Sequence, residues 1–213
     1  MTAFHPLPML SIDAIFSASE FPAWTNETCL VEAKLDGVAL ELVYEHGVLT
    51  EALLRGDGHR GEVVTEQASQ VSGVRLTLPA GAPGYLVVRG EVVMLRAATP
   101  AWKTGRHLAA ARLRSASASK DGLLFVAHGA PTLDEETEAG AMLQLDFYGF
   151  TVAPRILNGA GSDLARAVQT MRSRTLPYDS DGVVVKINDR DRQVQLGTGP
   201  RAPRWAVACK WGS

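Results

Sequence analysis

The chain has few cysteines: only Cys29 and Cys209 occur among its 213 residues, and they lie far apart in the sequence. Neither has a second thiol nearby, which excludes a disulfide framework and a four-cysteine zinc site. Sparse cysteine is typical of proteins in a reducing compartment, so we expect a cytoplasmic location.

Long apolar runs are also missing. The first ten residues lack a basic region followed by an apolar stretch. No segment approaches the roughly 18 apolar residues that a membrane-spanning helix needs. We therefore expect a soluble protein that has no membrane partner, and we expect it to act as a monomer.

Excess positive charge is absent as well. The 21 lysines and arginines are outnumbered by 23 aspartates and glutamates, which gives a net charge of -2. Binding nucleic acid by bulk electrostatics requires many basic residues against the phosphates, so any such contact must come from local clusters. The chain does contain 46% hydrophobic residues, which is enough to bury a substantial core.

Short segments rich in valine, leucine and tyrosine recur between turn signals and predict β-strands. Glu45-His46-Gly47 between two of them predicts an antiparallel hairpin, because glycine supplies the positive φ that a tight turn needs. The predicted strands are residues 29–33, 38–44, 48–54, 85–93, 123–126, 182–187 and 205–210.

Helices are predicted at residues 107–115, 133–148 and 162–172. The last of these has Ser162 and Asp163 at its start, where short polar side chains cap a helix. Strands and helices do not alternate regularly along the chain. This order favours an α+β fold, with antiparallel sheets and flanking helices, over a doubly wound sheet.

A lysine stands at the end of a predicted strand in Glu32-Ala33-Lys34-Leu35-Asp36-Gly37. A lysine amine is a nucleophile only when unprotonated, and burial or neighbouring cations supply that form by lowering its pKa. Such short patterns also arise by chance as a surface lysine before a turn. Lys120-Asp121-Gly122 has a similar composition, yet its adjacent charges and serine-rich surroundings predict an ordinary turn.

A second lysine ends the strand predicted in Asp181-Gly182-Val183-Val184-Val185-Lys186. Side chains alternate between the faces of a strand, so Lys186 shares a face with Val184 and Gly182. A buried strand that ends in a lysine needs a partner for that charge.

Six blocks of sequence follow one another in a recognisable order. They are Pro8-Met9-Leu10-Ser11-Ile12-Asp13; Lys34-Leu35-Asp36-Gly37; Arg55-Gly56-Asp57-Gly58 with Gly61-Glu62-Val63-Val64-Thr65; Val88-Arg89-Gly90-Glu91-Val92; Leu176-Pro177-Tyr178-Asp179-Ser180 running into the second lysine motif; and Gln195-Leu196-Gly197 with Arg201-Ala202-Pro203-Arg204-Trp205-Ala206-Val207-Ala208-Cys209-Lys210. This series resembles the adenylation domain of NAD-dependent DNA ligases, and the resemblance extends over nearly the whole chain.

The resemblance implies the nucleotidyltransferase fold of DNA ligases and mRNA capping enzymes, which is related to the ATP-grasp fold. In this family the motif lysine attacks the α-phosphorus of the nucleotide and forms lysyl-AMP. AMP then passes to a 5′-phosphate, and a 3′-hydroxyl displaces it. Lys34 matches the nucleophile. The implied cofactors are NAD as the AMP donor, with ATP left open, and Mg²⁺, because the reaction must neutralise phosphate charge.

The same resemblance implies roles for further residues. Asp36 and Lys210 join Lys34 as expected catalytic residues, and Asp181 is similar to the family's carboxylate near the metal. His128 stands where the family has a tyrosine that packs near the adenine, although a lone histidine at a strand end is more often structural. The expected nucleotide-binding residues are Glu32, Leu35, Arg55, Glu91, His128 and Lys186.

Arg106 and Arg114 flank an alanine-rich turn that is similar to the family's arginine, asparagine, alanine and glycine block. The turn departs from that block, since His107 replaces the asparagine and Ala111-Arg112 replaces a glycine-serine pair. Arginine side chains bind phosphate with a fork of donors, so the resemblance implies phosphate or DNA contact. The alternative is an exposed helix with paired charges.

We expect residues 1–213 to form a single adenylation domain. The resemblance includes no counterpart of the family's segment that binds nicotinamide mononucleotide, nor of its oligonucleotide-binding (OB) barrel, zinc module, helical hairpins or BRCT domain. Three interpretations stay open: an excised core of a longer ligase, a minimal ATP-using or NAD-using ligase acting on DNA or RNA, and a diverged module that binds nucleotide or nucleic acid without ligation. The complete set of lysines favours an enzyme whose partner is nicked or broken nucleic acid, DNA before RNA.

Overall fold

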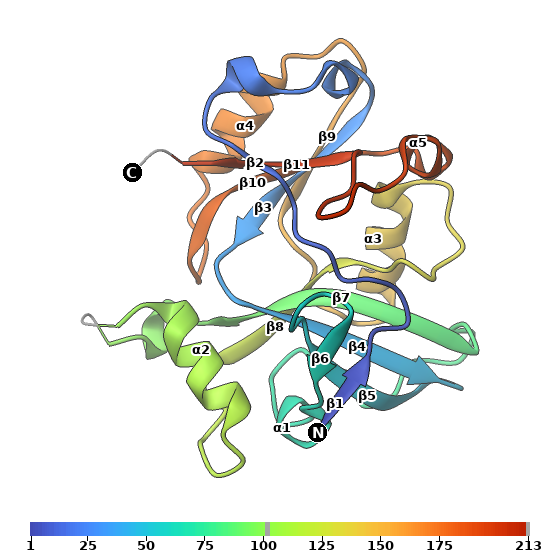
Figure 1. Cartoon of the computed structure of the whole chain (residues 1–213). Helices are drawn as coiled ribbons and strands as arrows, with labels where there is room; N and C mark the ends of the chain where they lie inside the picture. Colours follow the sequence, from blue (N-terminus) through green and yellow to red (C-terminus); the bar gives the residue numbers. More distant parts are fainter. Residues whose placement is uncertain (101–102, 212–213) are drawn as a thin grey trace.

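A computed structural model describes residues 1–100 and 103–211. Two β-sheets face each other and form the upper and lower halves of the molecule in Figure 1. The chain passes from the upper to the lower sheet between β3 and β4, so the two sheets are built around one continuous segment.

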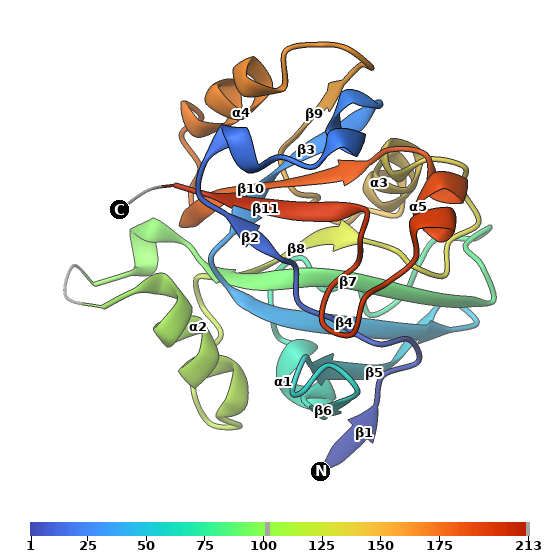
Figure 2. The same cartoon turned by 45° about the horizontal axis from the view of Figure 1, so that its top comes forward.

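The upper sheet has five strands in the order β2, β11, β10, β3 and β9. All its pairings are antiparallel except that of β2 with β11, which is parallel. Helix α4 covers its outer face (Figure 2). The bounds are Ala14–Ile15 for β2, Cys29–Leu35 for β3, Arg155–Asn158 for β9, Ser180–Ile187 for β10, Ala206–Lys210 for β11 and Leu164–Arg172 for α4.

The lower sheet has four antiparallel strands in the order β5, β4, β7 and β8. Helices α1, α2 and α3 contribute side chains to its apolar core. The bounds are Val38–Glu45 for β4, Val48–Leu54 for β5, Tyr85–Met94 for β7, Leu123–Gly129 for β8, Thr65–Ala68 for α1, Gly105–Arg114 for α2 and Glu138–Phe147 for α3.

Shorter elements complete the described part of the chain. Strands β1 and β6 pair antiparallel as a two-stranded sheet beside the lower half. Their bounds are Thr2–Phe4 and Arg60–Glu62; helix α5 spans Arg190–Leu196, and the 3-10 helices η1, η2 and η3 span Ala18–Glu20, Ala23–Asn26 and Arg96–Ala98. None of the helices within residues 1–100 and 103–211 is long and apolar enough to cross a membrane.

The period of two along the strands separates the core from the space between the sheets. In β3, Val31 and Ala33 pack into the core beneath α4, while Glu32 and Lys34 line the opposite side. In β7 the apolar Val88 packs into the lower core. Polar side chains of the two sheets therefore face each other.

All seven predicted strands are present, and the α+β class with antiparallel pairing is confirmed. The predicted hairpin is confirmed too, with φ of 49° at His46 and 76° at Gly47. The expected ordinary turn at Lys120 also forms, with φ of 77° at Gly122. There the Lys120 ammonium is buried and donates to the carbonyls of Ser115 and Ala118.

The predicted helix over residues 133–148 is wrong at its start. Helix α3 begins at Glu138, because the hydroxyl of Thr137 accepts a hydrogen bond from the amide of Gly140 and caps the helix there. The predicted cap of the following helix is confirmed, since the Asp163 carboxylate accepts from the amide of Arg166.

Candidate active site

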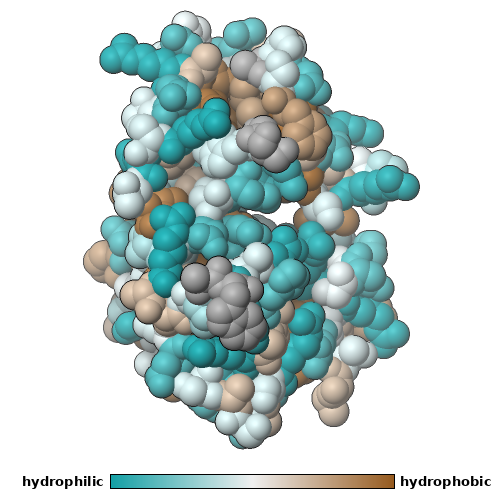
Figure 3. Space-filling view, turned by 90° about the vertical axis from the view of Figure 1, so that its left-hand side faces the viewer, coloured by the Kyte–Doolittle hydropathy of each residue, from teal (hydrophilic) through white to brown (hydrophobic). Residues whose placement is uncertain are grey.

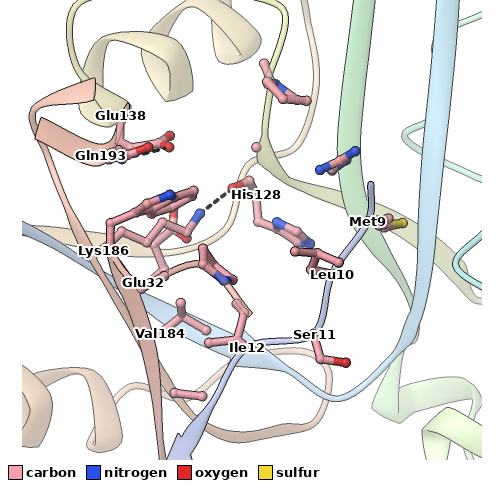
Figure 4. A pocket seen from close by; sticks show the side chains of 18 of the residues that line it. Met9, Leu10, Ser11, Ile12, Glu32, His128, Glu138, Val184, Lys186 and Gln193 are labelled. Atoms are coloured by element: carbon pink, nitrogen blue, oxygen red, sulfur yellow. Dashed lines mark hydrogen bonds and ion pairs between the residues drawn. The ribbon is translucent and has the colours of Figure 1, made fainter. Parts of the chain in front are cut away.

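A cavity of about 770 Å³ lies between the two sheets. Strands β3, β10 and β11 line it from the upper sheet, and β7 and β8 line it from the lower one. Residues 8–12 form a further wall opposite Lys186 (Figure 4). The space-filling view of Figure 3 shows a hollow between the two halves, with mostly hydrophilic side chains around it.

The side chain of Lys34 meets Asp181 at the edge of this cavity. Lys34 Nζ donates to Asp181 Oδ1 over 2.7 Å, and Lys210 Nζ lies 3.4 Å from Asp181 Oδ2. Strand pairing explains the cluster, because Gly182, the residue after Asp181, lies opposite Lys34 in β3 and opposite Lys210 in β11. The contact with the Asp181 carboxylate fixes the position of the Lys34 side chain at the edge of the cavity.

Lys186 has the charge partner that the sequence pattern requires. Its Nζ lies 2.7 Å from Glu32 Oε2 and donates to the carbonyl of His128 over 2.6 Å. Burial would by itself lower the pKa of Lys186, but the nearby Glu32 carboxylate outweighs it and raises the pKa. Burial raises the pKa of Glu32, against the opposing effect of Lys186. Lys186 therefore stays charged.

Three buried carboxylate oxygens of cavity-lining residues have no protein partner. They are Glu32 Oε1, Glu91 Oε2 and Glu138 Oε2, which accept no hydrogen bond from residues 1–100 and 103–211. Burial, opposed by the charges of Arg106 and Lys34, raises the pKa of Glu91 to about 7. Buried polar groups are normally satisfied, so these oxygens mark positions where a ligand would supply donors.

The lower sheet adds an aromatic ring and a guanidinium group. Burial, together with the Lys186 charge, lowers the pKa of His128 to about 3. The His128 imidazole is therefore neutral near pH 7 and offers a flat, weakly polar face to the cavity (Figure 4). Arg55 also lines the cavity and donates to the hydroxyl of Ser11.

The predicted site residues after Lys34 divide between the cavity wall and the surface. Leu35 is buried and lines the cavity. Asp36 lies just beyond β3, where its Oδ1 is 3.4 Å from Nη1 of Arg106. Arg114 lies at the other end of α2, about 12 Å along the helix axis from Arg106, and pairs instead with Glu62. The structure thus brings Arg106, but not Arg114, to the cluster around Lys34.

Several cavity residues have no signal in the sequence blocks. Glu138 is buried, and the side chain of Gln193 donates to it within the wall (Figure 4). Arg89 stood in a matching block but was not predicted to act. Its guanidinium contacts the buried Glu41. Only the alternation of β4 and β7, which aligns Glu41 with Arg89, could have indicated this pair.

The expected metal ligand Asp181 is part of no acidic cluster. No group of three or more histidine, cysteine, aspartate or glutamate side chains that could hold a metal ion occurs in the described ranges. Both Asp181 oxygens already face ammonium groups. An all-protein metal cage is therefore absent from this part of the chain.

Comparisons with known proteins identify the family of the chain. The model of the NAD-dependent DNA ligase adenylation domain family matches residues 1–213. A DNA ligase of Desulforapulum autotrophicum is 36% identical over 250 residues, an alignment that covers 99% of this chain and 36% of that protein. The chain thus spans about a third of that relative.

Solved structures of DNA ligases share the fold. The ligase domain of LigD from M. tuberculosis has a TM-score of 0.58 at 19% identity, covering 96% of this chain and 60% of that one. Mycobacterial DNA ligase D complexed with ATP scores 0.55 at 20% identity over the same shares. A Lig E DNA ligase scores 0.55 at 13% identity, covering 94% and 68%. The expected nucleotidyltransferase fold is confirmed, and the chain belongs to the NAD-dependent DNA ligase adenylation domain family.

Proposed function

We propose that this domain accepts AMP from NAD on Lys34 and passes it to nucleic acid. The Lys34 amine attacks the α-phosphorus of NAD, a nitrogen–phosphorus bond forms, and the bond to nicotinamide mononucleotide breaks. That leaving group departs with its phosphate, and the amine loses its proton. The observation that carries this proposal is that Lys34 and Lys210 both contact the carboxylate of Asp181.

Asp181 has a double role in this proposal. It holds the Lys34 ammonium at 2.7 Å before the reaction. It is also the carboxylate in reach of the proton that Lys34 must lose before it can attack. Lys210 would stabilise the negative charge that the phosphate develops, because an ammonium close to the reacting group lowers the barrier. Asp36 would keep Arg106 near the same phosphate.

The unpartnered oxygens support adenosine as the bound group. Glu91 would accept from a ribose hydroxyl beside Arg55, and Glu32 would accept from the amino group of the base. Lys186 holds Glu32 in place and would donate to the base edge. The neutral ring of His128 would stack on the base, which a charged imidazolium would do less well in a buried site.

Magnesium fits this site only as an ion held mainly by substrate. Magnesium in proteins usually takes one or two carboxylates and completes its shell with phosphate oxygens and water. Asp181 is the carboxylate that would hold it, next to the nucleotide phosphates. When bound, the ion would neutralise charge on those phosphates.

The later steps join two strands. A 5′-phosphate oxygen attacks the phosphorus of lysyl-AMP, and the nitrogen–phosphorus bond breaks. A 3′-hydroxyl then attacks that 5′-phosphate, a phosphodiester forms and AMP leaves. Arg106 and Arg114 are exposed on α2 and would contact the nucleic acid, with DNA favoured by the family. We propose that residues 1–213 act as one monomeric domain.

Intact mass tests the first step. The protein is incubated with magnesium and either NAD or ATP. We expect a gain of one AMP with NAD, and its loss in Lys34→Ala because that variant lacks the proposed nucleophile. Lys120→Ala is the matched control, since Lys120 has a similar motif but bonds only to backbone carbonyls. A mass gain with ATP and none with NAD would show that ATP, and not NAD, is the AMP donor.

No mass gain with either donor, together with nucleic-acid binding that survives Lys34→Ala, would refute the enzyme and favour the binding module. Sealing of pre-adenylated nicked DNA and RNA then tests the later steps separately. We expect wild-type protein to seal the DNA substrate faster than the RNA substrate.

A further inference from the structure

A buried ionic network lies beside the cavity and outside the cluster around Lys34. His5 Nδ1 is 2.8 Å from Glu41 Oε1, and both side chains are fully buried. Arg89 Nε is 2.8 Å from the other oxygen, Glu41 Oε2. His5 Nε2 is 3.0 Å from the backbone carbonyl oxygen of Arg55. The network therefore joins the N-terminal segment to β4, β7 and the end of β5.

The His5 ring contacts two groups at once. The backbone carbonyl of Arg55 can only accept, so Nε2 donates to it. Nδ1 lies within hydrogen-bond distance of Glu41 Oε1, and Glu41 Oε2 accepts from the guanidinium of Arg89. One buried carboxyl group is thus shared by His5 and Arg89.

The network holds a segment that we call the strap, residues 6–12. The strap crosses the cavity from the lower sheet to β2 of the upper sheet (Figure 1). Met9, Leu10, Ser11 and Ile12 of the strap line the cavity (Figure 4). The position of the strap therefore decides the shape of one cavity wall.

Few backbone hydrogen bonds hold the strap. Pro6 and Pro8 have no amide hydrogen to donate. The amide of Met9 donates to Gly58, and Nη2 of Arg89 donates to the carbonyl of Leu7. His5 precedes the strap directly, and Arg89 grips it from β7. Side chains of the network therefore hold the strap in place, as backbone pairing holds the strands in the sheets.

We propose that His5, Glu41 and Arg89 are positioning residues that hold the strap as a wall of the nucleotide cavity. The role rests on the proposed function, since the strap is read as a wall for the adenosine group. The network acts through the strap and touches no reacting atom. It sets affinity for the nucleotide rather than the rate of the chemical step.

The positioning role is tested with AMP as the probe, by calorimetry. Loss of the buried hydrogen bonds of His5 predicts that His5→Ala raises the dissociation constant for AMP about tenfold. The rate of AMP transfer to Lys34 at saturating NAD should stay within about threefold of wild type. His5→Gln keeps one donor, so its dissociation constant for AMP should lie between those of wild type and His5→Ala. His59→Ala is the matched control, an exposed histidine in the adjoining hairpin.

Hydrogen exchange separates positioning from general destabilisation. His5→Ala should speed exchange in residues 7–12 while β3 stays protected, because Arg89 still compensates Glu41. Equal loss of protection throughout, or an unchanged affinity for AMP in His5→Ala, would overturn the role. Wild-type protein that binds AMP but gains no mass from NAD or ATP would refute the proposed function and leave the strap result standing.

Discussion

At the scale of single residues, three buried glutamates differ in how protein partners compensate their charge. Glu41 has two basic partners, His5 and Arg89, Glu32 has one, and Glu91 forms no ion pair within the described residues. A buried charge without a partner is strongly unfavourable, and the group takes up a proton instead. The raised pKa of Glu91, about 7, follows from this.

Glu91 makes stability depend on pH. Its pKa rises from 4.5 when unfolded to about 7 in the folded protein, so the folded state binds the proton more tightly between these values. Stability therefore falls as pH rises through this window, by on the order of 3 kcal/mol. Glu91→Gln is neutral at every pH, and should gain that amount relative to wild type between pH 4.5 and pH 8.

Urea unfolding at several pH values between 4.5 and 8 measures this difference. Glu45→Gln, at an exposed glutamate of the same sheet, is the matched control. A difference between Glu91→Gln and wild type that is the same at pH 4.5 and pH 8 would contradict the assignment of the proton to Glu91.

At the scale of elements, the strands were predictable and the shortest pieces were not. Strand β5 matches its prediction at both ends, because turn residues bound it, with Gly47 directly before it and Gly56 shortly after it. Strands β2 and β9 and helix α5 have two to seven residues, too few to establish a period. Strand β9 exists only because β3 offers an edge for pairing.

Gly182 in β10 allows the close approach of β11. A Cβ atom there would lie 2.3 Å from the carbonyl oxygen of Cys209, which is too close without moving a strand. Gly182→Ala should therefore shift Asp181 relative to Lys34 and Lys210. We expect AMP transfer to slow at least about tenfold, and stability to fall by about 1–3 kcal/mol from overpacking.

Single-turnover adenylation and urea unfolding measure these two effects. Gly84→Ala is the matched control, because a Cβ at Gly84 meets no atom within 4 Å. Transfer by Gly182→Ala at the wild-type rate would show that the close approach of β10 and β11 does not position the cluster.

At the scale of the whole molecule, the cavity takes residues from both sheets. Lys34 and Glu32 belong to the upper sheet, while Glu91 and His128 belong to the lower one. A nucleotide that contacts all four would bind only when both sheets are folded and correctly placed. Binding then stabilises the two halves together.

AMP at a hundred times its dissociation constant should add about 2.7 kcal/mol of stability. For a domain of this size we expect the melting temperature to rise by about 5 to 10 °C in a single transition. Scanning calorimetry measures it, with cytidine monophosphate at the same concentration as control. Two transitions, of which AMP shifts only one, would contradict a shared site.

The sequence by itself determined the seven main strands, the α+β class and the family, since alternation and ordered motifs are local properties of the chain. It also placed Lys186 on one face of its strand with Val184 and Gly182, through the period of two. The buried charge of Lys186 required a partner, but the sequence pattern could not identify that partner as Glu32.

Only the tertiary structure decided which distant side chains meet. Asp181 reaches Lys34 across 147 positions of sequence because β10 pairs with β3 in one register. It decided that Arg106 faces the cluster while Arg114 pairs with Glu62. It also enclosed His5 with Glu41. Such contacts depend on register and on the packing of whole elements, and a local pattern contains neither.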